Sequence, residues 1–120
     1  MILPNISEFI KKYIVKRNES FFYEDLKKNK KLLIDAIKGK SILVIGGAGT
    51  IGSSFIKAAL KYKPSKLVVV DTNENGLTEL TRTLRSDLKI QVPSTYLTYP
   101  MSFSSDVFYK MMKKYSTFDI

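Results

Sequence analysis

The chain has 120 residues, enough for one small domain with a buried core. It contains neither cysteine nor histidine. This excludes disulfides, cysteine-based metal sites or nucleophiles, and histidine as a general base or metal ligand. The formal net charge is +9, but the lysines occur as separate pairs among acidic residues. That pattern favours solvated helix faces over a nucleic-acid or membrane-surface partner, so we expect no metal site and no nucleic-acid partner.

The sequence also lacks the usual signs of a membrane or secreted protein. No apolar run approaches the ~20 residues that a membrane span needs. Residues 1–4 lack the basic and long apolar regions of a secretion signal. We therefore expect a cytoplasmic protein without a membrane span.

Residues 1–39 are predicted to form a helical, lysine-rich segment. Helical spacing first joins a set of apolar residues, Ile6, Phe9, Ile10, Tyr13 and Ile14, with Asn5 or Ser7 as the N-cap. A second set follows a polar break: Leu26, Leu33, Ile34 and Ile37, with Gly39 as the C-cap. We expect these apolar faces to cover the edge or face of a sheet; the alternative is packing on a partner chain.

A glycine-rich stretch after the first predicted strand is the main candidate for a ligand site. The apolar run over residues 40–45 predicts a buried parallel strand, and a helical pattern begins at Thr50. Gly46 is expected to turn the chain, Gly49 to admit a pyrophosphate to the backbone, and Gly52 to let the helix approach the strand. The N–H groups of residues 48–51 would hold the phosphates. The predicted cofactor-binding residues here are Gly46, Gly47, Ala48, Gly49, Thr50, Ile51 and Gly52.

The second part of the predicted site follows the next strand. Residues 66–70 form another apolar run, and Asp71 stands at its end, where an acid accepts hydrogen bonds from the adenosine ribose. The alternative is that Asp71 only caps the following helix. Thr72 and Asn73, also predicted to bind the cofactor, occupy positions where an arginine or lysine would favour NADP. We therefore expect NAD or NADP as the cofactor, with NAD favoured.

The remaining sequence continues the alternation of helices and strands. The helix over residues 50–62 is expected to face inward through Ile51, Phe55, Ile56, Ala59 and Leu60. The next helix gathers Leu77, Leu80, Leu84 and Leu88 on one face. A third strand over residues 96–99 precedes a helix that Ser104 or Ser105 caps, with Val107, Phe108, Met111 and Met112 apolar.

Residues 40–120 are therefore predicted to form an α/β domain, an incomplete NAD(P)-binding Rossmann domain. It would be a partial, doubly wound parallel sheet with strand order 3-2-1, preceded by the N-terminal helical segment. A fourth strand is expected where residues 118–120 stand, so we expect an open edge beside the first strand. That edge, or the N-terminal helices, offers a route to a homo-oligomer.

Three stretches carry a family resemblance. They are residues 39–53 (GKSILVIGGAGTIGS), residues 64–80 (PSKLVVVDTNENGLTEL) and the lysine-rich helical lead-in. Together they resemble the extended short-chain dehydrogenase/reductase family. Within it they look most like the nucleotide-sugar epimerase/dehydratases of bacterial polysaccharide biosynthesis, of the UDP-N-acetylglucosamine 4,6-dehydratase type. The resemblance covers roughly residues 23–120 and is specific for the cofactor half alone.

The resemblance implies an activity for a complete enzyme. Such an enzyme oxidises C4 of a UDP-sugar by hydride transfer to NAD(P), eliminates water or epimerises the keto-sugar, and returns the hydride. The family's catalytic Tyr-x-x-x-Lys pair, its Ser/Thr and its sugar-nucleotide domain lie further along than residue 120. We therefore expect no catalytic residue in this chain, and a UDP-sugar partner only in a longer parent chain.

Two local features depart from the family pattern. Tyr109 and Lys113 have the Tyr-x-x-x-Lys spacing, but they lie on a helix that comes too early, so we interpret the match as a coincidence. After the third strand the family usually has an aspartate that meets the adenine, whereas Pro100 stands here and offers only its carbonyl. This departure puts the usual mode of adenine recognition in question.

The sequence thus predicts the dinucleotide-binding N-terminal part of a nucleotide-sugar dehydratase or epimerase, inactive by itself. The alternative is a non-catalytic dinucleotide-binding or interaction module. Electrostatic binding to nucleic acid is a third and weaker alternative.

Overall fold

The computed structural model describes residues 5–115 and 117–120. The chain divides into two compact units, Met1–Leu32 and Leu33–Ile120. Residues 1–4, on which the expectation of no secretion signal rests, lie outside the described residues.

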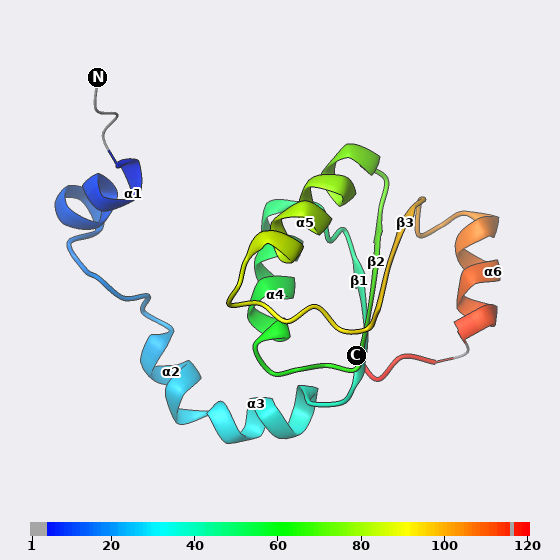
Figure 1. Cartoon of the computed structure of the whole chain (residues 1–120), viewed down its shortest axis with the longest axis horizontal. Helices are drawn as coiled ribbons and strands as arrows, with labels where there is room; N and C mark the ends of the chain where they lie inside the picture. Colours follow the sequence, from blue (N-terminus) through cyan, green and yellow to red (C-terminus); the bar gives the residue numbers. More distant parts are fainter. Residues whose placement is uncertain (1–4, 116) are drawn as a thin grey trace. The chain divides into compact units, whose positions relative to one another are not determined.

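Short helices make up the first unit. Helix α1 (Ile6–Phe9) continues into a π-helix, η1 (Ile10–Val15), and α2 (Tyr23–Lys28) follows (Figure 1). Helix α3 (Lys30–Ile37) leads on into the second unit. Asn5 Oδ1 accepts a hydrogen bond from the Glu8 N–H at 3.2 Å, so Asn5 rather than Ser7 is the N-cap. No residue of α1, η1 or α2 is buried.

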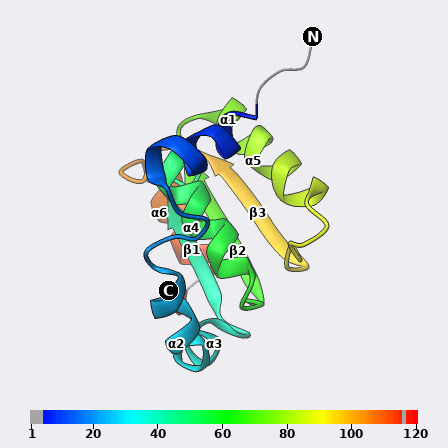
Figure 2. The same ribbon diagram turned by 90° about the vertical axis from the view of Figure 1, so that its left-hand side faces the viewer.

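The second unit is built on a three-stranded parallel sheet. Its strands are β1 (Ser41–Ile45), β2 (Lys66–Asp71) and β3 (Thr95–Pro100), in the order β1-β2-β3 (Figure 2). Val44 pairs with Val69, and Asp71 pairs with Pro100. The predicted α/β class and the strand order 3-2-1 are therefore confirmed.

Helices cover both faces of this sheet. Helices α4 (Thr50–Leu60) and α5 (Glu74–Ser86) lie on one face, and α6 (Asp106–Tyr115) lies on the other (Figure 1). Successive side chains of β2 pack against the helices on opposite faces of the sheet. Leu67 and Val69 pack in the cluster with α4 and α5, while Val68 and Val70 pack with Phe108 and Met111 of α6. A central strand that is buried on both faces explains the uninterrupted apolar run in its sequence.

Some residues that were expected to be buried are exposed. Ile51 is 87% exposed and Phe55 46%, and Leu88 is fully exposed. The contact of Gly52 with the turn directs the helix face of Gly52, Ile56 and Ala59 to the sheet. Ile51 and Phe55 lie one residue away, about 100° around the helix, and so turn outward.

Leu88 is exposed because α5 ends at Ser86, earlier than the leucine spacing predicts. Asp87 has an extended backbone, and its Oδ1 accepts a hydrogen bond from the Lys89 N–H at 2.9 Å. This local turn takes the place of another helical turn.

The last residues of the chain bind to the outer edge of β1. The Ile120 N–H donates to the Ser41 carbonyl at 3.2 Å, and the Ile120 carbonyl accepts from the Leu43 N–H at 2.9 Å. Asp119 Oδ2 accepts from both the N–H and the hydroxyl of Ser41, each at 2.8 Å. The alternating main-chain bonds follow the pattern of a parallel ladder. The expectation of an open edge beside the first strand is therefore wrong for Ser41–Leu43.

Candidate functional site

The turn between β1 and α4 depends on two glycines for its shape. Gly46 has φ +79°, a left-handed conformation that favours glycine, and its N–H donates to the Val70 carbonyl at 2.7 Å. At Gly52, a Cβ would lie 2.3 Å from the Gly46 carbonyl oxygen. Such an approach is impossible for any other residue without movement of the backbone. Gly46 and Gly52 together hold the start of α4 against the end of β1.

Neither the backbone conformation nor the packing within the chain requires glycine at position 49. Its backbone is extended (φ −77°, ψ 171°), and a Cβ there would come no closer than 3.5 Å to the Gly46 carbonyl oxygen. A Cβ on Gly46 would also meet nothing within 4 Å. Gly46 and Gly49 therefore border open space in front of the helix. Gly49 is the N-cap of α4 and supplies no side chain to the N–H groups of the first turn, which have no partner within the helix.

The other predicted residues of the turn differ in their surroundings. Gly47 is buried, and a Cβ there would lie 2.2 Å from Cγ1 of Val69, so this glycine faces the core. The Ala48 N–H points to the side chain of Asp71 rather than to open space. Thr50 and Ile51 are exposed in the first turn of α4. The donors that remain for an anion are therefore those of the helix start.

Asp71 joins the two halves of the candidate site. Its Oδ2 accepts a hydrogen bond from the Ala48 N–H, and its Oδ1 accepts one from the Asn73 N–H, both at 2.9 Å. A carboxylate has about four acceptor positions, so further donors can still bind. Helix α5 is capped by Asn73, whose Oδ1 accepts from the Gly76 N–H at 2.9 Å. The reading of Asp71 as a mere helix cap is therefore wrong, because its neighbour Asn73 has that role.

Gly76 is a residue that the sequence reading missed. A Cβ on Gly76 would lie 2.9 Å from the Cβ of Ala48, so the first turn of α5 lies directly against the glycine turn. The signal was present in the sequence, because a glycine inside an amphipathic helix pattern usually marks a close approach.

A hollow of about 310 Å³ opens at the carboxyl edge of the sheet, beside Asp71. Its lining residues come from the ends of all three strands: Ile45, Gly46, Val70, Asp71, Thr72, Met101, Ser102 and Phe103. Of these, Met101, Ser102 and Phe103 follow Pro100, which stands where the family resemblance implies an acid. Pro100 itself is the last residue of β3 and does not line the hollow.

The Tyr109 and Lys113 pair is not part of this hollow. Tyr109 lies on α6 with 59% of its surface exposed, and neither residue lines the hollow beside Asp71. The geometry gives the pair no contact with the candidate site.

The titratable groups with perturbed pKa values also lie outside the hollow, within the part of the chain that the structure describes. Burial raises the pKa of Tyr96, and a hydrogen bond with Thr81 opposes that shift. The hydrogen bond with the Tyr115 hydroxyl raises the pKa of Tyr99 to about 12. The hydrogen bonds from Ser41 lower the pKa of Asp119. None of these groups offers a general acid or base to the hollow.

The architecture of the second unit defines its class. A parallel sheet covered by helices on both faces, with a glycine turn after the first strand, is a partial Rossmann-like α/β unit. Sequence comparison then gives the family. The pattern of the polysaccharide biosynthesis protein family matches residues 42–114, more than half of the chain, and the chain belongs to that family.

A similar protein extends the comparison. Over 50 residues the chain is 46% identical to an uncharacterised membrane protein of Methanocaldococcus jannaschii. The match takes in 42% of this chain and 15% of that protein. The expected cytoplasmic location is contradicted by this relative, which is named a membrane protein. Among the described helices, none has the length and apolar character that crossing a bilayer requires.

Proposed function

We propose that the unit Leu33–Ile120 binds a nicotinamide dinucleotide at the carboxyl edge of its sheet, with NAD preferred over NADP. The observation that carries this proposal is the placement of the Asp71 carboxylate against the glycine turn, with acceptor positions still open. An acid at this point accepts hydrogen bonds from the ribose hydroxyls and repels a 2′-phosphate. Thr72, which follows it, offers no positive charge to offset that repulsion.

The glycine turn fits the phosphates of such a ligand. Gly46 and Gly49 face open space, so a pyrophosphate can approach the backbone without meeting a side chain. The free N–H groups at the start of α4 and the positive end of the helix dipole favour an anion there. In this arrangement Ala48 does not donate to the phosphates; it keeps Asp71 in position.

The adenine would occupy the hollow beside Asp71. Met101 and Phe103 present apolar surface there, and the Ser102 hydroxyl is a polar group that could take the place of the acid that the family resemblance implies. Phe103 is 61% exposed, which leaves its ring free to pack against a base. Packing against these side chains would take the place of an acid–adenine hydrogen bond.

The wider role we propose is in a nucleotide-sugar dehydratase or epimerase of polysaccharide biosynthesis. Membership of the polysaccharide biosynthesis protein family supports it, as do the motifs shared with UDP-N-acetylglucosamine 4,6-dehydratases. A bound nicotinamide would supply the hydride acceptor, while this chain's residues would bind and orient the dinucleotide. A UDP-sugar would meet residues of a longer parent chain, and residues 1–120 alone would have no catalytic activity.

Calorimetric titration of the chain with NAD and with NADP tests this proposal. We expect NAD to bind more tightly than NADP. We also expect Phe103→Ala to weaken NAD about tenfold without loss of stability, as stacking contacts do. Asp106→Asn, which removes an exposed acid at the start of α6, is the matched control and should bind NAD normally. No binding of either dinucleotide to a folded sample would overturn the proposal.

A further inference from the structure

The unit Met1–Leu32 carries an apolar surface that the dinucleotide proposal does not use. Phe21 and Phe22 are 77% and 69% exposed, and the apolar residues of α1 and η1 are exposed as well. We call this set the N-terminal apolar patch: Phe9, Ile10, Tyr13, Ile14, Phe21 and Phe22. An exposed group of large apolar side chains of this kind marks an interaction site.

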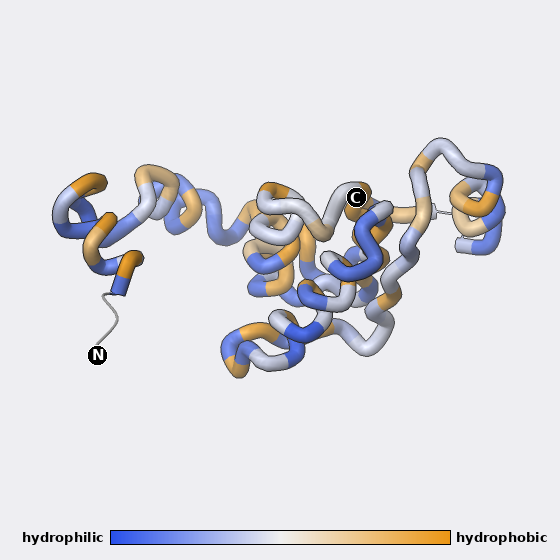
Figure 3. Tube along the Cα trace, turned by 90° about the horizontal axis from the view of Figure 1, so that it is seen from above, coloured by the Kyte–Doolittle hydropathy of each residue, from blue (hydrophilic) through white to orange (hydrophobic). Residues whose placement is uncertain are grey.

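Within the helical part the patch forms one face. The rings of Phe9 and Tyr13, four residues apart, have their centroids 5.0 Å from each other. Ile10 and Ile14 repeat the same spacing one residue further on. Figure 3 shows apolar and hydrophilic residues in alternation along this segment, as an amphipathic helix requires.

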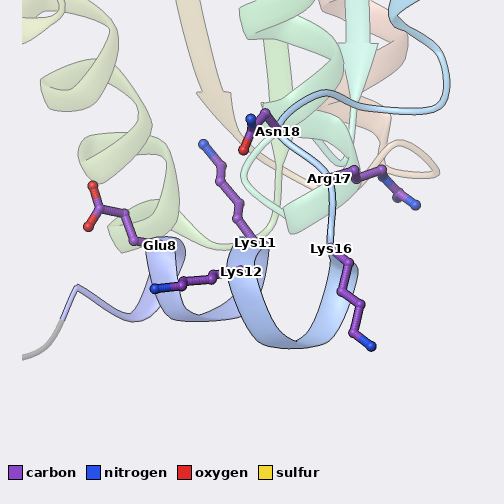
Figure 4. Close-up of a pocket in the computed structure, with 6 residues that line it drawn as sticks. All are labelled: Glu8, Lys11, Lys12, Lys16, Arg17 and Asn18. Atoms are coloured by element: carbon purple, nitrogen blue, oxygen red, sulfur yellow. The ribbon is translucent and has the colours of Figure 1, made fainter.

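Positive charges border the patch. Four cations, Lys11, Lys12, Lys16 and Arg17, line a hollow of about 790 Å³, and among its described lining residues Glu8 is the acid (Figure 4). Lys12 Nζ lies 5.3 Å from the ring centroid of Tyr13, and Arg17 Cζ lies 3.5 Å from that of Phe21. Two of the four cations therefore lie against aromatic rings of the patch. We call these four residues the basic rim.

We propose that the N-terminal apolar patch and its basic rim bind the surface of an anionic lipid bilayer. Aromatic and aliphatic side chains would enter the boundary between headgroups and acyl chains, and the basic rim would bind anionic headgroups. Nucleic acid would also attract the cations and stack on the rings, but Ile10 and Ile14 would gain nothing from it. The pairing of aliphatic residues with cations therefore favours lipid.

The length of the helical segment determines how it binds. Residues Ile6–Val15 span at most about 15 Å, the length they would have at the rise of an α-helix, which is roughly half of the ~30 Å hydrocarbon core. The segment is therefore too short to cross the bilayer and lies along its surface. This binding is independent of the dinucleotide site, so either proposal can fail alone.

Vesicle flotation of the full chain tests the inference. We expect the chain to float with vesicles of phosphatidylglycerol and phosphatidylcholine, and to remain below vesicles of phosphatidylcholine alone. Replacing the basic rim (K11Q, K12Q, K16Q and R17Q) should weaken binding on the order of 100-fold, since each cation near an anionic surface contributes to the affinity. The matched control K27Q, K28Q, K30Q and K31Q removes the same amount of charge from α2 and α3 and should weaken vesicle binding much less.

A fluorescence measurement separates insertion from simple charge attraction. The chain has no tryptophan, so Phe22→Trp creates a unique reporter at a position already exposed. Its emission should shift to the blue on anionic vesicles. That of Leu88→Trp, at a fully exposed position in the second unit, should not.

Three results would overturn the inference. The first is equal loss of flotation in the basic-rim variant and its matched control. The second is binding to a DNA or RNA duplex that the basic rim mediates while vesicles go unbound. The third is self-association that Phe21→Ser with Phe22→Ser abolishes, again without vesicle binding, because a second copy would then cover the patch.

Discussion

The Oδ2 atom of Asp71 lies 2.9 Å from the backbone nitrogen of Ala48, so the acid at the end of β2 holds the turn that follows β1. The other carboxylate oxygen holds the backbone of Asn73 at the start of α5. One side chain thus fixes the entrances to two helices, and the ribose acceptor that we propose is also a structural residue. Changes at Asp71 should affect both stability and ligand binding.

The first prediction concerns Asp71→Ala. The Ala48 and Asn73 N–H groups lose their acceptor, and we expect the free energy of unfolding to fall by about 1–3 kcal/mol. The affinity for NAD should fall more than that for NADP, because only NAD gains from the acid. Denaturant unfolding and calorimetric titration measure the two effects. Equal losses of affinity for NAD and NADP would contradict the proposal that Asp71 binds the ribose.

The second prediction contrasts two glycines three residues apart. In Gly52→Ala the new Cβ would lie 2.3 Å from the Gly46 carbonyl oxygen, and overpacking of this kind costs about 1–3 kcal/mol or more. Gly49→Ala finds only an ordinary contact at 3.5 Å, so the fold should tolerate it while the space for a pyrophosphate shrinks. Thermal unfolding together with NAD titration checks both variants. A stable Gly52→Ala protein would show that the turn is less rigid than its geometry implies.

The third prediction compares Leu84, which lies in α5, with Leu88, which follows the end of that helix. Leu84 is fully buried, so Leu84→Ala should destabilise the fold by about 2–5 kcal/mol through the cavity it leaves. Leu88→Ala removes a side chain that touches only solvent and should change stability by less than about 0.5 kcal/mol. Chemical denaturation of the pair measures the difference. Similar losses would place Leu88 in the core after all.

The fourth prediction concerns the pH dependence of the β1 edge. Hydrogen bonds from the backbone and side chain of Ser41 lower the pKa of Asp119 below its ordinary 3.8. A lowered folded-state pKa stabilises the fold above the unfolded pKa, and this contribution is lost as the pH falls through the folded value. The amide of Leu43, which donates to Ile120, should therefore exchange faster below pH 3.8. In Asp119→Asn this acceleration of Leu43 amide exchange at low pH should be absent. If it persisted, another carboxylate would be responsible.

The fifth prediction concerns Tyr99 at high pH. The hydrogen bond with Tyr115 raises the Tyr99 pKa from 10.0 to about 12, so the folded state holds this proton more tightly than the unfolded state. The stabilisation is complete below pH 10 and declines as the pH rises through about 12. An ultraviolet difference titration of Tyr99→Phe against the unchanged chain should remove a late-titrating phenol. A titration curve that loses an ordinary phenol instead would contradict the assignment.

Much of the fold was predictable because local signals agreed with one another. The apolar runs, the glycine turn and the leucine spacing gave the order and class of the elements in the second unit. The buried set in β2 followed directly from its run of valines, since a strand covered on both faces needs apolar residues throughout.

Other features were not predictable because they depend on contacts distant in sequence. The rotation of α4, which exposes Ile51, is set by the approach of Gly52 to Gly46. The apolar pattern alone does not reveal that approach, because α4 carries apolar residues on several sides. The bond between Asp71 and Ala48 joins residues 23 positions apart, and periodicity carries no sign of it. The apolar face of Ile6–Ile14 is a similar case, because spacing identifies an apolar face but not its partner.

The pairing of Asp119 and Ile120 with β1 has a further consequence. The connection from β1 to β2 runs through α4 on one face of the sheet. The connection from β3 back to the edge of β1 runs through α6 on the other face. Where neighbouring connections cover opposite faces of a parallel sheet, a crevice forms outside the carboxyl ends of the strands at that point. Gly46 is the first residue beyond β1 at that end. The course of the main chain alone therefore makes room at the glycine turn.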